Sequence, residues 1–156
     1  MPLIFMCLLV APESPQFATL GDSAVNVTTP SQWAPQVTFK PEFGPTPEAF
    51  GEAYKKAYGK EPSYHAAGGY AAGLVLQYAI EQAGTLDADA VAAKLNAIHS
   101  TIFFGRVKFV DNPTSHGLQE GHTMMLVQWQ KKNGQLVREV VWPTAGASAP
   151  LAYPMH

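Results

Sequence analysis

Serine, histidine and aspartate occur close together in two segments, and these residue types can carry out nucleophilic catalysis. Ser63 lies two residues before His65, and Ser115 directly precedes His116, with Asp111 nearby. Ester hydrolysis needs a serine nucleophile, a histidine base within hydrogen-bond reach and an acid that orients the histidine. No G-x-S-x-G motif accompanies these serines. A helix beginning at Ser63 would still offer N–H groups to an oxyanion, so a small serine ester hydrolase is one hypothesis.

The five histidines raise the question of a metal site. His116 and His122 lie in one segment, "SHGLQEGH", with Glu120 between them. A divalent cation needs three or four ligands in a fixed geometry, and this segment offers only a loose arrangement. The single Cys7 excludes an internal disulfide and a four-cysteine zinc site. We therefore expect no metal and no other cofactor.

A carboxylate and three tryptophans are candidates for ligand contact. Glu13 follows an apolar run, and in α/β sheets ligands bind beyond the carboxyl ends of the strands. There it could accept charge-assisted hydrogen bonds from a ligand ammonium; the alternative is a solvated loop glutamate. Trp129 and Trp142 fall in strand-like segments and are expected in the core. Trp33 lies in a proline-rich segment and is the better candidate to line a cleft.

Composition indicates a folded domain without a nucleic-acid partner. The chain has 156 residues, of which 47% are hydrophobic, and 10 basic residues stand against 12 acidic ones without a basic stripe. The apolar run at residues 3–11 lies between Pro2 and Pro12, and no Lys or Arg precedes it. It is too short to span a membrane and has no positive region of a signal peptide. We expect it to form a buried parallel strand.

The middle of the chain predicts three helices. Thr46 is the expected N-cap of the first, followed by Pro47, with Phe50, Tyr54, Ala57 and Tyr58 on its core face and Gly59 at its end. The second runs from about residue 64 to 83, between an N-cap at Ser63 and a stop at Gly84. The third follows Asp87 and has Val91, Leu95 and Ile98 on one face.

The flanking segments predict strands. "SAVNVTT" is a short strand candidate, and the segment after His99 changes to a period of two. "HTMMLVQWQ" and "LVREVVW" form two strands, and Asn133-Gly134 between them is a strong hairpin signal. The order of strands, helices and a C-terminal β-hairpin predicts an α/β protein in which central helices are flanked by strands.

The order and spacing of these segments resemble one family. "KPEFGPTPEAFGEAYKKAYGKEPSYHAAGGYAAGLVLQYAIEQAG", "FFGRVKF", "MLVQWQ" and "VVWP" look like the C-terminal part of ABC-transporter solute-binding proteins of the branched-chain amino acid type. The resemblance covers about residues 3–155. Members have two α/β lobes that close on a small ligand, and they are more than twice as long. The resemblance therefore implies an incomplete, truncated form of the type I periplasmic-binding-protein fold.

The resemblance also implies how the chain divides. Residues 1–30 would be the remnant of one lobe, residues 31–45 a hinge-like connector, residues 46–143 part of the second lobe, and residues 144–156 an irregular tail. Its implied function is capture of an amino acid or small carboxylate for an ABC membrane permease, in the periplasm. An incomplete fold would expose apolar edges and faces, so a homo-oligomer is expected.

The same resemblance bears on the Ala/Gly-rich start of the second helix. In the family this helix begins at the cleft, which makes Tyr64 and His65 candidates for lining the ligand pocket. The alternative from the residues alone is that residues 66–73 form a close-packed helix face, with His65 half exposed at the helix start. A solute-binding protein should show saturable uptake without product, whereas a hydrolase should turn over a chromogenic ester.

Overall fold

The computed structural model describes residues 6–153, which fold into two compact units. Unit 1 joins the segment up to Thr38 to the segment from Met124 onward, and unit 2 is Phe39–Thr123. Along the chain one strand is followed by three α-helices and then four strands, so the predicted mixture of central helices flanked by strands is confirmed. The lobe boundaries expected from the sequence stay a prediction, although residues 124–143 belong here with the N-terminal segment.

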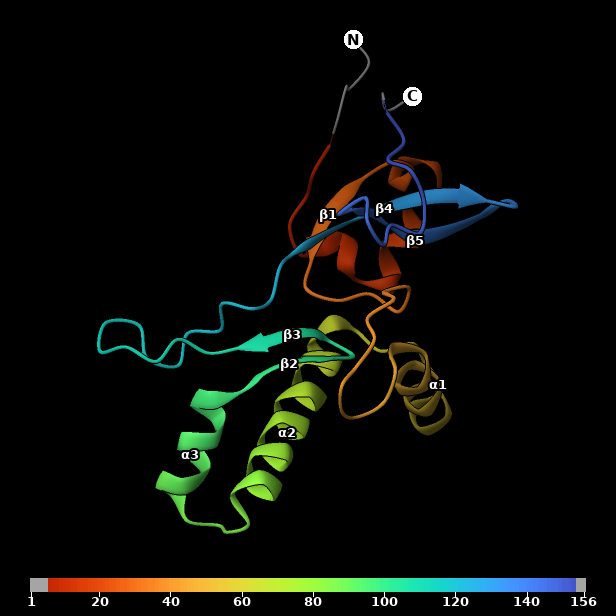
Figure 1. Ribbon diagram of the computed structural model, residues 1–156. Coiled ribbons are helices and arrows are strands. Elements are labelled where there is room, and N and C mark those ends of the chain that lie inside the picture. The colour runs from red at the N-terminus through yellow and green to blue at the C-terminus, as the bar shows by residue number, and fades with distance from the viewer. Residues whose placement is uncertain (1–5, 154–156) are drawn as a thin grey trace. The chain divides into compact units, whose positions relative to one another are not determined.

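Unit 1 is built around a three-stranded antiparallel sheet in the order β1-β4-β5 (Figure 1). Its elements are η1 (Ala11–Glu13), η2 (Pro15–Ala24), β1 (Thr28–Ser31), β4 (Met125–Lys132) and β5 (Gln135–Trp142). The predicted hairpin is confirmed, because Asn133 and Gly134 both have positive φ, at 51° and 80°, between β4 and β5. β1 pairs with β4, with Thr28 opposite Gln128.

The N-terminal segment differs from the predicted buried strand. Residues 3–5 lie outside the described part, and of the rest Cys7 makes a single parallel bridge to Thr28. Leu9 and Val10 are 73% and 70% exposed, and the chain then turns into the 3₁₀ segment η1. The chain leaves the extended conformation at Val10, which has a positive φ of 67°, and Pro12 has no N–H with which to continue a strand ladder. The second strand candidate begins late, at Thr28, because Asn26 adopts a positive φ of 64°.

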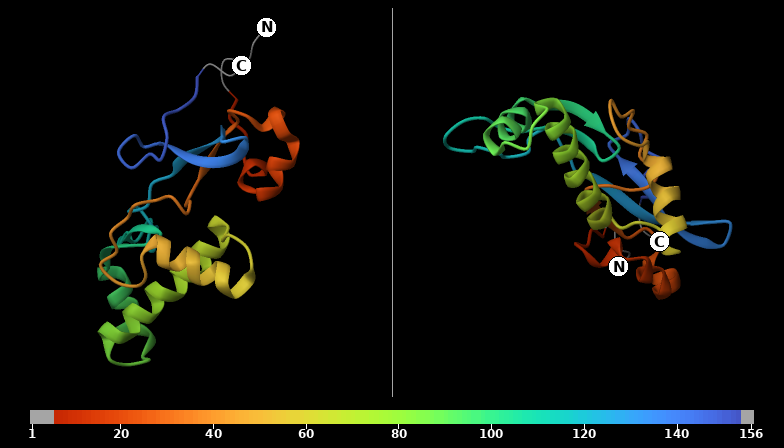
Figure 2. Two further views of the ribbon diagram at one scale, coloured as in Figure 1. Left: turned by 90° about the vertical axis from the view of Figure 1, so that its right-hand side faces the viewer. Right: turned by 90° about the horizontal axis from the view of Figure 1, so that it is seen from below.

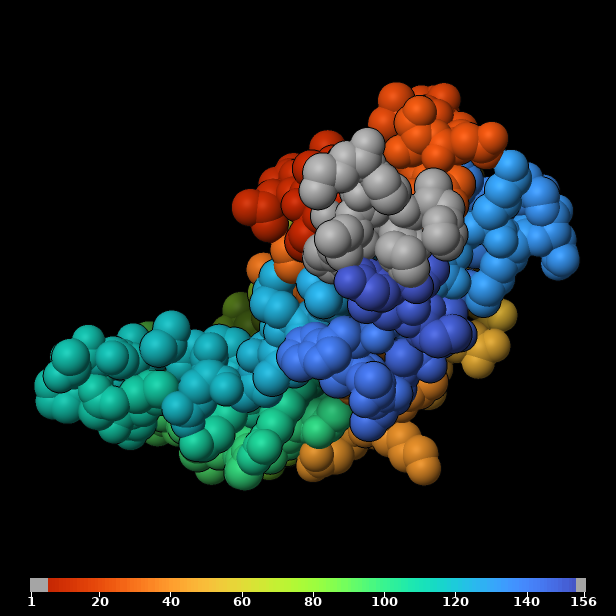
Figure 3. Space-filling view, turned by 90° about the horizontal axis from the view of Figure 1, so that it is seen from above, coloured from red at the N-terminus to blue at the C-terminus, as the bar shows by residue number. Residues whose placement is uncertain are grey.

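The C-terminal segment after β5 has no helix or strand among its described residues, and two glutamines of β4 hold it. The fully buried Gln128 accepts a hydrogen bond from the Ala152 N–H at 2.8 Å and donates one to the Ala152 carbonyl at 3.1 Å. Gln130 donates to the Pro150 carbonyl at 2.8 Å. Figure 3 shows this segment, in dark blue, on the surface beside the lighter blue hairpin. The described residues of this segment are therefore irregular yet anchored.

Unit 2 contains the three predicted helices and a small sheet. The elements are α1 (Pro47–Tyr58), α2 (Tyr64–Ala83), α3 (Ala88–Ala97), β2 (His99–Ile102) and β3 (Gly105–Lys108). The predicted caps are confirmed, since the side chains of Thr46, Ser63 and Asp87 each accept a backbone hydrogen bond. Gly59 and Gly84 end α1 and α2 in the left-handed conformation. Figures 1 and 2 show α2 and α3 side by side.

The small residues of α2 allow close packing within unit 2. Ala67 is fully buried and Ala71 is 6% exposed. A Cβ added at Gly68 would lie 3.5 Å from the Phe104 ring, so this ring rests directly on the helix backbone. The close-packed face that the Ala/Gly run suggested is therefore present.

Three expected core positions are wrong, and one of them is Ala57 of α1, which is exposed. Tyr58 of α1 is 66% exposed, and Trp142 at the end of β5 is 50% exposed. Both lie at the last residue of their element, where fewer neighbours can cover a large ring. Trp129, by contrast, is 4% exposed in the core as predicted.

Candidate functional site

Glu13 is buried in unit 1 and ion-paired within the protein. Its carboxylate lies 3.2 Å from Arg138 Nη1, which also donates a hydrogen bond to the Glu13 carbonyl at 2.8 Å. The side chain is 8% exposed, so the solvated-glutamate alternative is wrong. The 3₁₀ turn of η1 holds Glu13 in place, because Trp129 Nε1 donates to the Pro12 carbonyl at 2.8 Å. The Arg138 guanidinium lies 5.9 Å from the centre of the Trp129 ring, a cation–π distance.

Trp33 is also an interior residue of unit 1. It is 1% exposed, and its carbonyl accepts a hydrogen bond from Ser31 Oγ at 2.8 Å. Trp142 is the most exposed tryptophan of the chain. In this conformation Trp33 presents no face to solvent, so ligand contact by Trp33 stays a prediction that requires the surrounding segment to move.

Tyr64 and His65 occupy the first turn of α2 in unit 2. Their rings lie 3.9 Å apart between centroids, and His65 is exposed. The Ser63 hydroxyl accepts from the Ala66 N–H at 3.2 Å and so fixes the helix start. The positive end of a 20-residue helix therefore lies beside two accessible aromatic side chains, an arrangement that suits a carboxylate.

The four predicted ligand residues are divided equally between the units. Glu13 and Trp33 belong to unit 1, whereas Tyr64 and His65 belong to unit 2. Each pair is well defined within its own unit. That the pairs line one cleft stays a prediction.

The hydrolase candidates do not form a catalytic arrangement. The Ser63 hydroxyl caps α2, and the His65 ring lies against the Tyr64 ring at a tilt of 30°. His116 Nε2 lies 3.6 Å from Asp111 Oδ1, but both side chains are exposed, and the same nitrogen lies 3.2 Å from Asn96 Nδ2. Within residues 6–153 no hydrogen bond joins Ser63 to His65 or Ser115 to His116. In this arrangement His65 does not activate Ser63, and His116 does not activate Ser115.

The segment considered for metal binding is occupied by other contacts. His122 stacks on Phe104 with ring centroids 5.0 Å apart, and Glu120 pairs with Lys108. The described part of the chain holds no group of three His, Cys, Asp or Glu side chains that could bind a metal ion.

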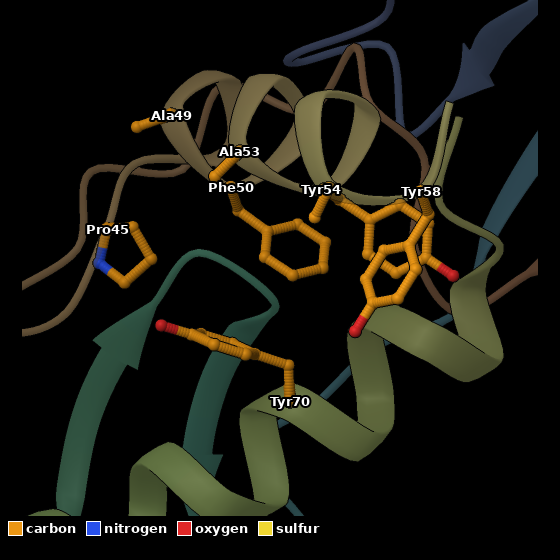
Figure 4. A pocket seen from close by; sticks show the side chains of 8 residues that line it. Pro45, Ala49, Phe50, Ala53, Tyr54, Tyr58 and Tyr70 are labelled. Carbon is orange, nitrogen blue, oxygen red and sulfur yellow. The ribbon is translucent and has the colours of Figure 1, made fainter. Parts of the chain in front are cut away.

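An aromatic pocket in unit 2 is a site that the sequence did not predict. Figure 4 shows Phe50, Tyr54 and Tyr58 extending from α1 toward Tyr70 of α2. The hollow measures about 240 Å³, and Pro45 and the alanines of α1 complete its walls. The sequence did contain a signal, because Phe50, Tyr54 and Tyr58 recur every four residues, but that spacing is equally typical of a core face.

A second hollow of unit 2 follows the small-residue face of α2. It measures about 300 Å³ and is lined by apolar side chains, with Gln119 as its polar member. Gly68, Ala71 and Val75 lie on the α2 side, and Phe104 and Phe109 come from the strand region. It offers no charged group that could orient a ligand.

The chain belongs to the periplasmic binding protein family, whose model matches residues 5–135. No curated protein matches it significantly. Among residues 6–153, no helix is long and apolar enough to cross a bilayer.

Solved structures show the same fold. The chain is 25% identical to a leucine-binding protein, LivK, from Thermotoga maritima MSB8, with a TM-score of 0.58. A Rhodopseudomonas palustris BisB5 solute-binding protein in complex with 3,4-dihydroxybenzoic acid shares 21% identity at a TM-score of 0.60. A substrate-binding protein from Desulfitobacterium hafniense, in complex with Leu, shares 23% identity at a TM-score of 0.53.

The match covers most of this chain and a minor part of each relative. It spans 89% of this chain and 38% of the Thermotoga protein, 78% and 31% for the Rhodopseudomonas protein, and 74% and 32% for the Desulfitobacterium protein. None of the three is described as an esterase. The resemblance that the sequence suggested is thus confirmed at the level of family and fold.

Proposed function

We propose that this chain supplies part of the ligand-binding apparatus of an ABC importer and captures a small carboxylic acid without chemical change. The observation that carries the proposal is the family match over residues 5–135. The likeness to the Thermotoga leucine-binding protein supports it. The two units would correspond to parts of the two lobes, and capture would take place outside the cytoplasm, in the periplasm.

The start of α2 is the proposed carboxylate site. Backbone N–H groups of a helix's first turn and the helix dipole favour an anion. Tyr64 and the exposed His65 stand beside them and can donate hydrogen bonds to the same carboxylate. The absence of a competing acidic residue in the first turn of α2 supports this assignment.

The ion pair of Glu13 bears on the ligand class. An amino acid would need a partner for its ammonium, and the Glu13 carboxylate already faces Arg138 at 3.2 Å. A carboxylic acid without an ammonium makes no such demand. We therefore propose that branched aliphatic and aromatic acids fit this chain at least as well as leucine does.

A ligand panel tests the proposal. The purified chain is melted alone and with leucine, valine, benzoate and 3,4-dihydroxybenzoate. A ligand at 100 times its dissociation constant should add about 2.7 kcal/mol of stability. His65→Ala should lower the affinity, and His116→Ala, which removes another exposed imidazole of unit 2, should not. A cooperative melt that none of the four acids moves would contradict the proposal.

Partner proposals follow from the same family. We expect an ABC membrane permease to receive the ligand. The exposed Leu9 and Val10 also support self-association, because exposed apolar segments recruit partners. Light scattering across a concentration series would test this, and a strictly monomeric mass at every concentration would contradict it.

A further inference from the structure

The aromatic pocket of unit 2 has walls of ring faces and small apolar groups. None of its lining side chains carries a charge. Phe50 is buried, whereas Tyr58 and Tyr70 are 66% and 49% exposed, so two ring faces remain partly open to solvent. The pocket is thus a small concave surface made mainly of tyrosine and phenylalanine.

The rings are arranged as a connected arc. Tyr58 lies 4.5 Å from Tyr54, and Phe50 lies 5.1 Å from Tyr70, measured between centroids. These pairs meet at 43° and 42°. Because the rings are tilted, they do not cover one another's faces by parallel stacking, and part of each face can contact a ligand. Figure 4 shows the Tyr70 ring below Phe50, with Tyr54 and Tyr58 at the far end of α1.

No positively charged side chain lines the pocket, and the charges carried by α1 are mixed. Glu48 and Glu52 are exposed on α1, each next in sequence to an alanine that lines the pocket. Lys56 opposes them, but the charge of Lys55 is offset by Glu61 at 2.7 Å. Lys56 is itself next in sequence to the lining Ala57, so the charges of α1 nearly balance and the aromatic ring faces supply the attraction for a cation.

We propose that this pocket binds a small organic cation that carries a trimethylammonium group. The negative faces of aromatic rings attract such a group, and its methyls fill an apolar hollow. A carboxylate would meet ring faces and no positive side chain. The volume of about 240 Å³ is smaller than pockets for drug-sized ligands, at about 300–1,000 Å³, which suits a head group of this size. The site is independent of the carboxylate site at the start of α2.

Choline and its uncharged isostere test the role of charge. Choline and 3,3-dimethylbutan-1-ol have the same shape but differ by one positive charge. We expect a saturable upfield shift of the choline N-methyl proton signal, caused by ring currents. Choline should bind about fivefold or more tightly than the alcohol if two ring faces contribute at an exposed site. Equal affinities would overturn the proposal, since the pocket would then be merely apolar, and so would the absence of choline binding.

Substitutions locate the site. Tyr58→Leu removes an exposed ring and should weaken choline binding at least threefold, whereas Tyr58→Phe keeps the ring face and should bind as before. Tyr153→Leu is the control, because Tyr153 is similarly exposed, at 62%, in unit 1. Unchanged helix content by circular dichroism would show that each variant is folded. Undiminished choline binding by Tyr58→Leu would place the cation elsewhere and overturn the proposal.

Discussion

Replacing Arg138 by methionine should destabilise unit 1 strongly. The substitution removes the 3.2 Å ion pair with Glu13, the 2.8 Å hydrogen bond to the Glu13 carbonyl and the contact with the Trp129 ring. It leaves a carboxylate that is only 8% exposed beside an apolar side chain. Breaking a buried pair in this way costs about 3–5 kcal/mol. Arg138 is 15% exposed, so partial screening places the expected loss near the lower end, at about 3 kcal/mol.

Tryptophan fluorescence can follow this loss, because Trp33, Trp129 and Trp142 all lie in unit 1. For a chain of this size, about 3 kcal/mol lowers the melting temperature by about 6–12 °C. Lys55→Met is the matched control, since it breaks an ion pair whose side chains are 64% and 48% exposed, and it should melt close to the unchanged protein. If Arg138→Met melted like that control, the ion pair would have no structural role and the reasoning would be refuted.

Glu13→Gln then separates a structural role from a ligand role. If Glu13 serves only to pair with Arg138, the Glu13→Gln variant should be less stable, and leucine and benzoate should still raise its melting temperature as they do in the unchanged protein. If Glu13 binds a ligand ammonium, the variant should lose the melting shift caused by leucine and keep the shift caused by benzoate. The second pattern would contradict the ligand class proposed above.

Three further predictions concern backbone conformation, helix capping and pH. Gly84→Ala should cost about 1 kcal/mol, because Gly84 has φ 65°, whereas Gly69→Ala, inside α2 with no atom near the added Cβ, should add about 0.5–1 kcal/mol; a gain at both positions in urea unfolding would contradict this. Ser63→Ala should lose about 1 kcal/mol of stability through the lost N-cap bond to Ala66. It should also leave hydrolysis of a chromogenic ester at the rate of the buffer, and serine-dependent turnover would reverse the conclusion on catalysis. Lys131 lowers the pKa of Asp22 below 3.8, first through a hydrogen bond and then through its charge. The resulting stabilisation is complete above pH 3.8 and is lost as pH falls through the lowered pKa. The melting temperature of Lys131→Met should therefore be lower than that of the unchanged protein at neutral pH, and the two melting temperatures should converge in acid. A difference in melting temperature that widened in acid would argue against the ion pair between Lys131 and Asp22.

Local signals predicted most of unit 2. Thr46, Ser63 and Asp87 mark helix starts, and Gly59 and Gly84 mark helix ends, because caps and left-handed glycines act over a few residues. The same is true of the Asn-Gly hairpin turn of unit 1. These elements depend on neighbours in sequence, and the sequence therefore contains their signals directly.

Pairing between distant segments could not be predicted in this way. The sequence grouped the hairpin with the helices, yet Thr28 pairs with Gln128 and Arg138 reaches Glu13. An apolar run does not reveal which strand it will meet, and Glu13 carries no sign of its partner. For the candidate site, the sequence identified polar and aromatic residues near a helix start or a strand end. It could not predict the ion pair between Glu13 and Arg138.

The way in which β4 holds the C-terminal segment has a consequence for sequence change. Gln128 and Gln130 reach the C-terminal segment through main-chain atoms of Ala152 and Pro150, so these bonds do not depend on the side chains at those two positions. Residue 150, a proline here, contributes only its carbonyl, which every residue type has. Residue 152 must keep its N–H, because this group donates to Gln128. Relatives of this chain should therefore tolerate wide variation at residue 150 and exclude proline at residue 152. The two glutamines, in contrast, should resist replacement, because few other side chains carry a donor and an acceptor at that reach.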